Sequence, residues 1–361
     1  MKLRAVLDGI SLRKLNGDPD IEITAVCAHS QEVTSGSLFI ALKGSLHDGH
    51  DFIPEAVAKG ARAVMVEEEV PVPAGISMAL VDNTQSAQAL AGKNFYGDPA
   101  SKLKLIGITG TKGKTTTAFM THSILKAAGF KTGLIGTIYN IVNGEKLATK
   151  NTTPDSLTLQ QLLAEMVKAK TEYVVMEVSS HAIALERIAG LSFFRGVFTN
   201  ITRDHLDFHH TFTEYLKVKT SFFRNLPPTA KAIINLDDPL GPQIATATNG
   251  EVIGYGLQAE FPVRAEKVKT AMKQTEFELI SPAGRLPIRL NLIGQFNVYN
   301  ALAAGAVGFS LGLNPETVGR GLEELPGVPG RFQLVPSQGE YTVIIDYAHT
   351  PDSLKNLLTT A

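Results

Sequence analysis

Short apolar runs alternate with helical patterns along the first hundred residues. Four runs rich in β-branched and other apolar residues are typical of strands: 21–28, 37–42, 61–67 and 77–81. Two stretches with apolar residues three or four positions apart favour helices: 52–59 and 85–96. The segment 96–101, which contains Gly-Asp-Pro, interrupts the pattern and indicates a linker. We therefore expect a small α/β domain over residues 1–98.

A second α/β pattern follows, and its apolar runs are continuous rather than alternating. The run at 103–109 leads into a glycine-rich turn and a helical pattern at 114–128. Three further runs predict buried strands: 173–178, 196–199 and 232–235. Strands covered on both faces have this continuous apolar character, which favours a parallel sheet. Residues 99–330 are therefore expected to form a parallel-sheet domain that includes a small-residue helix at 297–311.

The last thirty residues contain too little pattern for a domain of their own. A proline- and glycine-rich linker at 326–330 precedes one predicted strand, 341–345, and one predicted helix, 352–358. One strand and one helix cannot build an independent core. We expect either that 331–361 docks on the second domain or that it begins a third domain of a longer protein.

Composition and charge exclude several classes of protein. The 361 residues include 34 Lys and Arg and 35 Asp and Glu, and the formal net charge of -1 argues against a general nucleic-acid binder. Cys27 is the single cysteine, so neither an internal disulfide framework nor a four-cysteine zinc site is expected. No apolar stretch is long enough to cross a membrane, and the first residues lack the features of a signal peptide. We expect a cytoplasmic protein.

The strongest chemical signal is the run GITGTKGKTTT at residues 107–117. It follows a predicted strand and opens a predicted helix, where successive backbone N–H groups favour phosphate oxygens. Lys114 would neutralise the β- and γ-phosphates, and the Thr115 hydroxyl would bind Mg²⁺. The usual spacing requires a glycine five positions before Gly113, where this chain has Ile108, so the run is a variant phosphate-binding loop.

Two further strand ends carry ligand-type side chains. Glu177 lies near the end of the run at 173–178, which is where open α/β sheets bind ligands, and its carboxylate is a candidate Mg²⁺ ligand. The segment after 196–199 is unusually dense in such residues: Asn200, Asp204, His205, Asp207 and His209. Together with the phosphate-binding loop, this density predicts a metal or phosphate site.

In these three motifs the sequence resembles the Mur ligase superfamily, the ATP-dependent amide ligases of bacterial cell-wall synthesis. The order of GITGTKGKTTT, MEVSSHAIALER and TNITRDHLDFH is specific to that group. The runs LIGT at 134–137 and NTTPD at 151–155 resemble the branch that adds the third residue of the peptide stem. Further matching segments lie at 215–223, 235–238, 294–300, 330–332 and 346–354. The resemblance extends from residue 22 to the last residue.

The resemblance implies roles for individual residues. Lys219 corresponds to the carbamylated lysine of the family, which would join Glu177, His205 and Thr115 around Mg²⁺, with Lys114 as a further catalytic group. The expected ATP-binding residues are Gly110, Thr111, Lys112, Gly113, Lys114, Thr115, Thr116, Asn297, Arg331, Asp346 and His349. The residues expected to bind UDP-muramoyl-dipeptide are Ser30, Thr152, Thr153, Ser179 and Arg187. His29 and Gln31 depart from the family pattern around Ser30, and 47–52 is expected to form a turn rather than bind ligand.

The resemblance also implies a domain plan and a reaction. Residues 1–98 would bind UDP, 99–330 would bind ATP, and 331–361 would be the first β-α unit of a Rossmann-like ligase domain. ATP would activate the D-Glu carboxylate of UDP-N-acetylmuramoyl-L-Ala-D-Glu as an acyl phosphate, and a free amino acid would then form the amide. The segment that selects the amino acid is expected beyond Ala361, so the sequence does not distinguish meso-diaminopimelate from L-lysine. We favour meso-diaminopimelate because it is widespread among bacteria, and L-lysine stays possible.

Two expectations and two alternative functions stay open at this point. With only the start of its third domain, the chain is expected to have at most weak ligase activity alone, and it is expected to be a monomer. A ligase that lengthens folate with glutamate shares the phosphate-binding loop and the histidine motif, although Ser30 and the NTTPD run favour a UDP-sugar substrate. A non-catalytic protein that binds nucleotide or UDP-sugar is the other alternative.

Overall fold

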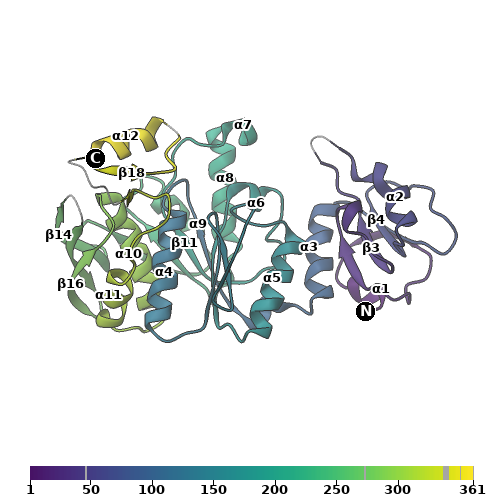
Figure 1. The fold of residues 1–361 in the computed structure, drawn as a ribbon, viewed down its shortest axis with the longest axis horizontal. Coiled ribbons are helices and arrows are strands. Elements are labelled where there is room, and N and C mark those ends of the chain that lie inside the picture. The colour runs from purple at the N-terminus through teal and green to yellow at the C-terminus, as the bar shows by residue number, and fades with distance from the viewer. Residues whose placement is uncertain (45–46, 272–273, 336–340, 350, 361) are drawn as a thin grey trace. The chain divides into compact units, whose positions relative to one another are not determined.

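The computed structural model describes residues 1–44, 47–271, 274–335, 341–349 and 351–360 (Figure 1). The chain forms two compact units. The first comprises Met1–Leu103, Pro154–Lys168 and His181–Leu191, and the second comprises Lys104–Thr153, Ala169–Ser180 and Ser192–Ala361. The predicted domain boundaries at residues 98 and 330 stay predictions.

The first unit is built on a five-stranded sheet with the order β1-β5-β4-β3-β2. Its strands are β1 (Leu12–Asn16), β2 (Ala25–Cys27), β3 (Ser37–Ile40), β4 (Ala63–Val66) and β5 (Ser77–Val81). Strands β2 to β5 are parallel and β1 pairs antiparallel with β5. The helices of this unit are α1 (Leu3–Val6), α2 (Ile53–Ala58), α3 (Thr84–Phe95) and α5 (Ser156–Lys168), and α6 (Ser180–Ala184) begins at its edge.

Alternate side chains of the central strands supply two cores, one on each face of this sheet. In β3, Leu38 and Ile40 pack in one core, whereas Phe39 packs in the other. All four residues of β3 and all four of β4 are buried, which explains their continuous apolar sequences. The predicted small α/β architecture is confirmed in this region.

The second unit contains an eleven-stranded sheet with the order β16-β15-β14-β13-β12-β11-β6-β10-β7-β8-β9. Its parallel centre consists of β6 (Lys104–Thr109), β7 (Thr132–Ile135), β10 (Tyr173–Glu177), β11 (Phe193–Phe198), β12 (Lys231–Asn235) and β13 (Glu251–Gly256). Strand β14 (Val263–Thr270) pairs parallel with β13 and antiparallel with β15 (Thr275–Ser281), which pairs antiparallel with β16 (Gly284–Leu290). On the other side, β8 (Asn140–Val142) and β9 (Glu145–Leu147) continue the sheet antiparallel from β7.

The prediction of a parallel sheet is therefore correct for the centre and wrong for both flanks. The sequence of β14 is VRAEKVKT, and charged residues interrupt its apolar positions. A strand with one solvated face needs apolar residues only on the other, so it lacks the continuous run that marks a buried parallel strand. The protein has a mixed α/β fold with a large, parallel-rich sheet.

Helices cover this sheet and bring the phosphate-loop helix into the core. The helices are α4 (Lys114–Ala127), α7 (Leu206–His209), α8 (Phe212–Arg224), α9 (Gly241–Ala247), α10 (Gln295–Ser310) and α11 (Pro315–Glu323). Both α10 and α11 pack against α4, as Figure 1 shows. A side chain at Gly321 would overlap the backbone of Ile124, so only glycine permits this close approach of α11 to α4. Among the described helices, none combines the length and apolar character that crossing a membrane requires.

The last described elements are a two-stranded ribbon and a helix. They are β17 (Gln333–Val335), β18 (Val343–Ile345) and α12 (Pro351–Thr360), and they group with the second unit. The predicted strand 341–345 begins two residues later in the structure, and the predicted helix 352–358 is slightly longer. Thr350, within the motif at 346–354, and Ala361 lie outside the described residues.

Candidate active site

The phosphate-binding loop joins β6 to α4 at the centre of the large sheet, where β6 lies between β10 and β11. Gly113 has φ 82°, in the left-handed region that favours glycine. A side chain at Gly113 would overlap Asn300 Oδ1, and one at Gly110 would overlap Thr199 Oγ1. The loop therefore requires both glycines because neighbouring side chains touch its backbone directly.

The segment after β11 holds this loop in place. The Asn200 side chain accepts a hydrogen bond from Lys112 N–H (3.0 Å) and donates one to the Lys112 carbonyl (3.1 Å). The Thr199 hydroxyl also donates to the Lys112 carbonyl, at 2.6 Å. Thr111 Oγ1 accepts from Thr202 N–H at 3.0 Å and lies 2.9 Å from the Tyr215 hydroxyl. The loop is thus pre-formed by neighbouring residues.

Lys114 folds back over the loop that precedes it. Its Nζ donates to the carbonyl oxygens of Gly110 and Thr111, at 2.9 Å each. Burial lowers the pKa of the Lys114 ammonium, and the nearby Glu177 carboxylate opposes that shift. The cation is therefore held at the mouth of the loop, where phosphate oxygens would replace the carbonyls.

Glu177, at the end of β10, is almost fully buried and is surrounded by donors. Its Oε2 accepts from the hydroxyls of Thr115 (2.8 Å) and Thr137 (3.0 Å), and its Oε1 accepts from Thr137 N–H (2.8 Å). A side chain at Gly136 would overlap Oε1, so the glycine makes room for the carboxylate. Arg331 donates to Thr115 Oγ1 at 3.1 Å, which places its guanidinium beside the first turn of α4.

Lys219 lies on α8 directly beneath the loop, with 1% of its surface exposed. Its Nζ donates to the Gly110 carbonyl (3.0 Å) and Thr109 Oγ1 (3.3 Å), and the described part of the chain gives it no ion pair. Burial lowers the pKa of Lys219 well below its usual range, and the positive charge of Lys114 lowers it further. The environment therefore favours the neutral amine.

Some of the residues predicted over 200–209 line a cavity, and others pack against neighbouring side chains. Asp204 and His205 line the cavity described below, and burial lowers the pKa of His205 while Asp204 opposes that change. His209 instead packs against the rings of Phe208 and Tyr215. Among the described residues, no three His, Cys, Asp or Glu side chains are grouped to hold a metal ion. The described contacts of Asn200 and Thr202 are to the phosphate-binding loop, and the metal or phosphate site predicted from this segment together with that loop stays a prediction.

A cavity of about 490 Å³ opens above the loop. The predicted residues that line it are Thr111, Lys112, Gly113, Lys114, Thr115, Thr116, Thr152, Glu177, Asn200, Asp204, His205, Arg331, Asp346 and His349. The predicted residues of the second unit outside this lining are Gly110, Thr153, Ser179, Asp207, His209, Lys219 and Asn297. The volume is in the range of small-molecule sites, and most of the expected nucleotide residues face it.

Residues outside the lining support those within it. Asn297 Oδ1 accepts from Asn300 Nδ2 at 3.0 Å, and Asn300 in turn accepts from the Thr117 hydroxyl at 3.2 Å. Thr153 donates to the Glu177 carbonyl at 2.8 Å and accepts from Ser179 N–H at 3.0 Å. Asn297 and Thr153 therefore have visible structural roles beside the ligand-binding roles that the sequence suggested.

Residues 331–332 and 346–349 line one part of the cavity. Asp346 accepts hydrogen bonds from the backbone N–H groups of Phe332 and Ala348, at 2.7 Å each. The Arg331 guanidinium lies 5.0 Å from the centre of the Tyr347 ring, a cation–π distance. Asp346 thus shapes the backbone that presents Arg331 and His349 to the cavity.

The two remaining predicted residues, Ser30 and Arg187, belong to the first unit. The Ser30 hydroxyl donates to Glu55 Oε2 at 2.9 Å, and Lys59 bridges Glu55 and the Ser30 carbonyl. Arg187 is half-buried in the segment after α6. No feature of the sequence indicated that Glu55 would accept the Ser30 hydroxyl.

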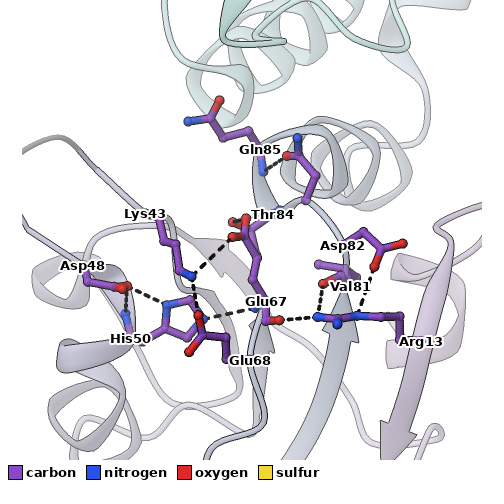
Figure 2. Close-up of polar contacts among 11 residues, drawn as sticks. Arg13, Lys43, Asp48, His50, Glu67, Glu68, Val81, Asp82, Thr84 and Gln85 are labelled. Atoms are coloured by element: carbon purple, nitrogen blue, oxygen red, sulfur yellow. Dashed lines mark hydrogen bonds and ion pairs between the residues drawn. The ribbon is translucent and has the colours of Figure 1, made fainter.

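The segment 47–52 forms the expected turn (Figure 2). Asp48 accepts from His50 N–H at 2.9 Å, and the His50 ring joins Asp48 to the Glu67 N–H at the end of β4. The Glu67 carboxylate accepts from the backbone N–H and the hydroxyl of Thr84 at the start of α3. Figure 2 shows these residues joined by hydrogen bonds around the one-turn 3₁₀ helix Gly49–Phe52, so local turn formation is confirmed. That the segment does not bind ligand stays a prediction.

Sequence reasoning gave no role to several residues of the cavity, among them Thr137, Tyr299 and Asn300. Each lies within a segment that carried the resemblance without a stated role, LIGT at 134–137 or the run at 294–300. The Tyr299 hydroxyl donates to Asp237 Oδ2 at 3.0 Å, and no pattern in the sequence links these two residues.

Comparison with known proteins gives consistent matches along the chain. Residues 108–308 match the Mur ligase middle domain, and residues 22–94 match the Mur ligase family catalytic domain. The UDP-N-acetylmuramoyl-L-alanyl-D-glutamate--2,6-diaminopimelate ligase of Bacillus licheniformis is 43% identical over 350 residues, which cover 95% of this chain and 71% of that protein. A solved structure described by the same ligase name has a TM-score of 0.83 and 26% identity, and the match covers 100% of this chain and 74% of that one. The apo form of L. casei FPGS shares the fold at 18% identity, with a TM-score of 0.64 over 76% of this chain and 75% of its own. The chain belongs to the Mur ligase family.

Proposed function

We propose that the protein is an ATP-dependent ligase that joins an amino acid to the D-Glu carboxylate of UDP-N-acetylmuramoyl-L-Ala-D-Glu. The observation that carries this proposal is the cavity above the phosphate-binding loop, which Lys114, Glu177 and Arg331 line together. The names of relatives about 40% identical support the same substrates. The reaction belongs to peptidoglycan precursor synthesis.

A carboxylate resists attack by an amine, so it must first be activated. The D-Glu carboxylate oxygen attacks the γ-phosphorus of ATP, which forms an acyl phosphate and releases ADP. The amine of the incoming amino acid then attacks the acyl carbon and loses a proton, and the tetrahedral intermediate expels inorganic phosphate as the amide forms. The loop N–H groups, Lys114 and Arg331 offset the negative charge of the two reacting anions.

The residues around Glu177 fit Mg²⁺. Glu177 and Thr115 present oxygen atoms 2.8 Å apart, and oxygen donors are the ligands that Mg²⁺ prefers, completed by phosphates and water. We propose that His205 and Lys219 complete the set, with Lys219 as its carbamate. A buried neutral amine can react with CO₂ to give an anionic oxygen ligand, and the depressed pKa of Lys219 supports that reaction. When bound, Mg²⁺ would neutralise phosphate charge during transfer.

The residues proposed to bind UDP-muramoyl-dipeptide belong to both units. In the second unit, Thr152 faces the cavity, and Thr153 and Ser179 lie outside its lining and are hydrogen-bonded to each other. In the first unit, Ser30 and Arg187 are proposed to contact other parts of the substrate, since an arginine can pair with a carboxylate or a phosphate through two hydrogen bonds. We propose meso-diaminopimelate as the incoming amino acid because the relatives' names include it, with L-lysine as the alternative.

Product formation tests the proposal. The chain, in excess over UDP-N-acetylmuramoyl-L-Ala-D-Glu, is mixed with ATP, Mg²⁺ and either meso-diaminopimelate or L-lysine, and products are identified by mass spectrometry. We expect a tripeptide product with one ADP formed for each amide. A folate substrate with glutamate serves as the competing reaction, and Lys114→Ala serves as the inactive control. Binding of both substrates without any amide, or amide formation only on folate, would contradict the proposal.

A further inference from the structure

Thr137 lies at the point where two groups of proposed ligand-binding residues meet. It follows β7 and Gly136, and it lines the cavity beside Glu177 and Thr152. Its backbone N–H and its hydroxyl both bond to the Glu177 carboxylate, at 2.8 and 3.0 Å. Its hydroxyl also lies 3.1 Å from Thr152 Oγ1. These contacts connect the proposed metal side of the cavity to its proposed dipeptide side.

The proton count limits these hydrogen bonds. A threonine hydroxyl has one proton to donate, whereas a carboxylate only accepts. The Thr137 hydroxyl lies within donating distance of both Glu177 Oε2 and Thr152 Oγ1, so these two oxygens compete for its one proton. On the opposite side, Thr115 donates to the same Oε2 and accepts from Arg331. Glu177 Oε2 therefore receives the proton of Thr115 and shares the proton of Thr137 with Thr152.

We propose that Thr137 is a positioning residue that orients the Glu177 carboxylate toward Thr115 and couples it to the occupancy of Thr152. The inference rests on the proposed function, because it supposes that Glu177 and Thr115 hold a divalent cation. Two of the three described donors to the Glu177 carboxylate come from Thr137, and Gly136 leaves the carboxylate against the backbone. Without the Thr137 hydroxyl, Oε2 loses one of its two described donors and the carboxylate can rotate.

The coupling follows from the single proton of Thr137. When the Thr152 oxygen accepts a hydrogen bond from the bound dipeptide substrate, it no longer competes for that proton. The hydrogen bond from Thr137 to Glu177 is then formed a larger share of the time. Because linkage between two sites is reciprocal, a cation at Glu177 must alter the substrate affinity by the same factor.

The first test measures Mn²⁺ binding, as a paramagnetic substitute for Mg²⁺, to the full chain with ADP present, by electron paramagnetic resonance. Thr137→Val keeps the shape of the side chain and removes the hydroxyl, and we expect about tenfold weaker Mn²⁺ binding, as for other residues that orient metal ligands. Thr137→Ser restores the hydroxyl and should restore the affinity. Thr121→Val is the matched control, because the buried Thr121 hydroxyl donates to the Thr117 carbonyl within its own helix. Melting temperatures confirm that each variant is folded.

The second test is a double-mutant cycle with Thr152. Thr152→Val removes the competing acceptor and should strengthen Mn²⁺ binding by about threefold, the range of a single net hydrogen bond. In the double variant the affinity should equal that of Thr137→Val alone, since no shared proton remains. Unchanged Mn²⁺ affinity in Thr137→Val, or effects of the two substitutions that multiply in the double variant, would overturn this inference alone. A native chain that binds no Mn²⁺ with ADP would overturn the proposed function as well.

Discussion

Two buried ionisable side chains flank the phosphate-binding loop in opposite environments. Glu177, at the end of β10, is met by three hydrogen-bond donors from Thr115 and Thr137. Lys219, beneath the loop, is met by one carbonyl and one hydroxyl, and its main charged influence is the like charge of Lys114. The difference shows that the fold stabilises a negative charge at one place and disfavours a positive charge at the other. Both environments suit ligands of a cation, provided that the lysine becomes a carbamate.

The largest effect is expected from removing the amine of Lys219. Lys219→Met keeps the buried chain length, and we expect ligase activity to fall by about a hundredfold or more, as when a group that stabilises transition-state charge is lost. Because the described residues give the buried amine no acidic partner, the substitution leaves no unpaired carboxylate and folding should be undisturbed. Initial rates and chemical denaturation measure the two effects. Native activity in this variant would show that the environment of Lys219 has no catalytic purpose.

The substitution Gly136→Ala tests the orientation of the Glu177 carboxylate. The new Cβ would overlap Glu177 Oε1, so the carboxylate must turn away from Thr137. We expect about a tenfold loss of activity and a higher Mg²⁺ requirement, the effect of a misplaced ligand. Gly305→Ala is the control, because its Cβ would make only ordinary contacts in α10. Equal activity in the two variants would show that the orientation of Glu177 is unimportant.

The dependence of stability on pH tests the amine side without an activity assay. The pKa of Lys219 is lowered in the folded protein, so at pH values between that pKa and the usual lysine value the unfolded chain binds one more proton. Stability must then rise with pH in this window, by up to about 1.4 kcal/mol per pH unit from this group. Urea unfolding of the native chain and of Lys219→Met at pH 7, 8 and 9 measures the difference in slope. If the free energy of unfolding depends on pH with the same slope in both proteins, the Lys219 amine is not neutral in the folded chain.

The smallest effect is expected at the Tyr215 hydroxyl, which lies 2.9 Å from Thr111 Oγ1. This contact joins α8, the helix that carries Lys219, to the phosphate-binding loop. Tyr215→Phe should reduce the free energy of unfolding by about 1 kcal/mol, the net value of one hydrogen bond, and raise the KM for ATP. Tyr173→Phe is the control, since its hydroxyl accepts from Lys104 at the start of β6, away from the loop. An equal KM in both variants would separate Tyr215 from nucleotide binding.

Sequence patterns were most informative where chemistry and fold share a short segment. The phosphate-binding loop and Glu177 each follow a continuous apolar strand, so their position at one sheet edge could be predicted from the sequence. Lys219 was indicated only by the family resemblance, and nothing in its local sequence showed that its amine would be buried. The mixed flanks of the sheet escaped prediction because charged residues interrupt the apolar positions of β14.

Contacts between residues far apart in the sequence could not be predicted from it. Thr137 bonds to Glu177 across 40 positions, and Ser30 bonds to Glu55 across 25, and neither pair has a periodicity that marks it. Such pairs depend on which strands become neighbours, which local propensity does not encode. Asp346, which acts through backbone contacts, was identified as a site residue without its structural role.

In the proposed mechanism, one carboxylate oxygen of the substrate becomes part of the released phosphate. The most direct measurement uses UDP-N-acetylmuramoyl-L-Ala-D-Glu labelled with ¹⁸O in the reacting carboxylate, with ATP, Mg²⁺ and meso-diaminopimelate. Mass spectrometry of the inorganic phosphate should show one ¹⁸O atom for each amide formed, since the acyl phosphate breaks between carbon and oxygen. Phosphate that carries no ¹⁸O while the amide still forms would contradict an acyl-phosphate intermediate.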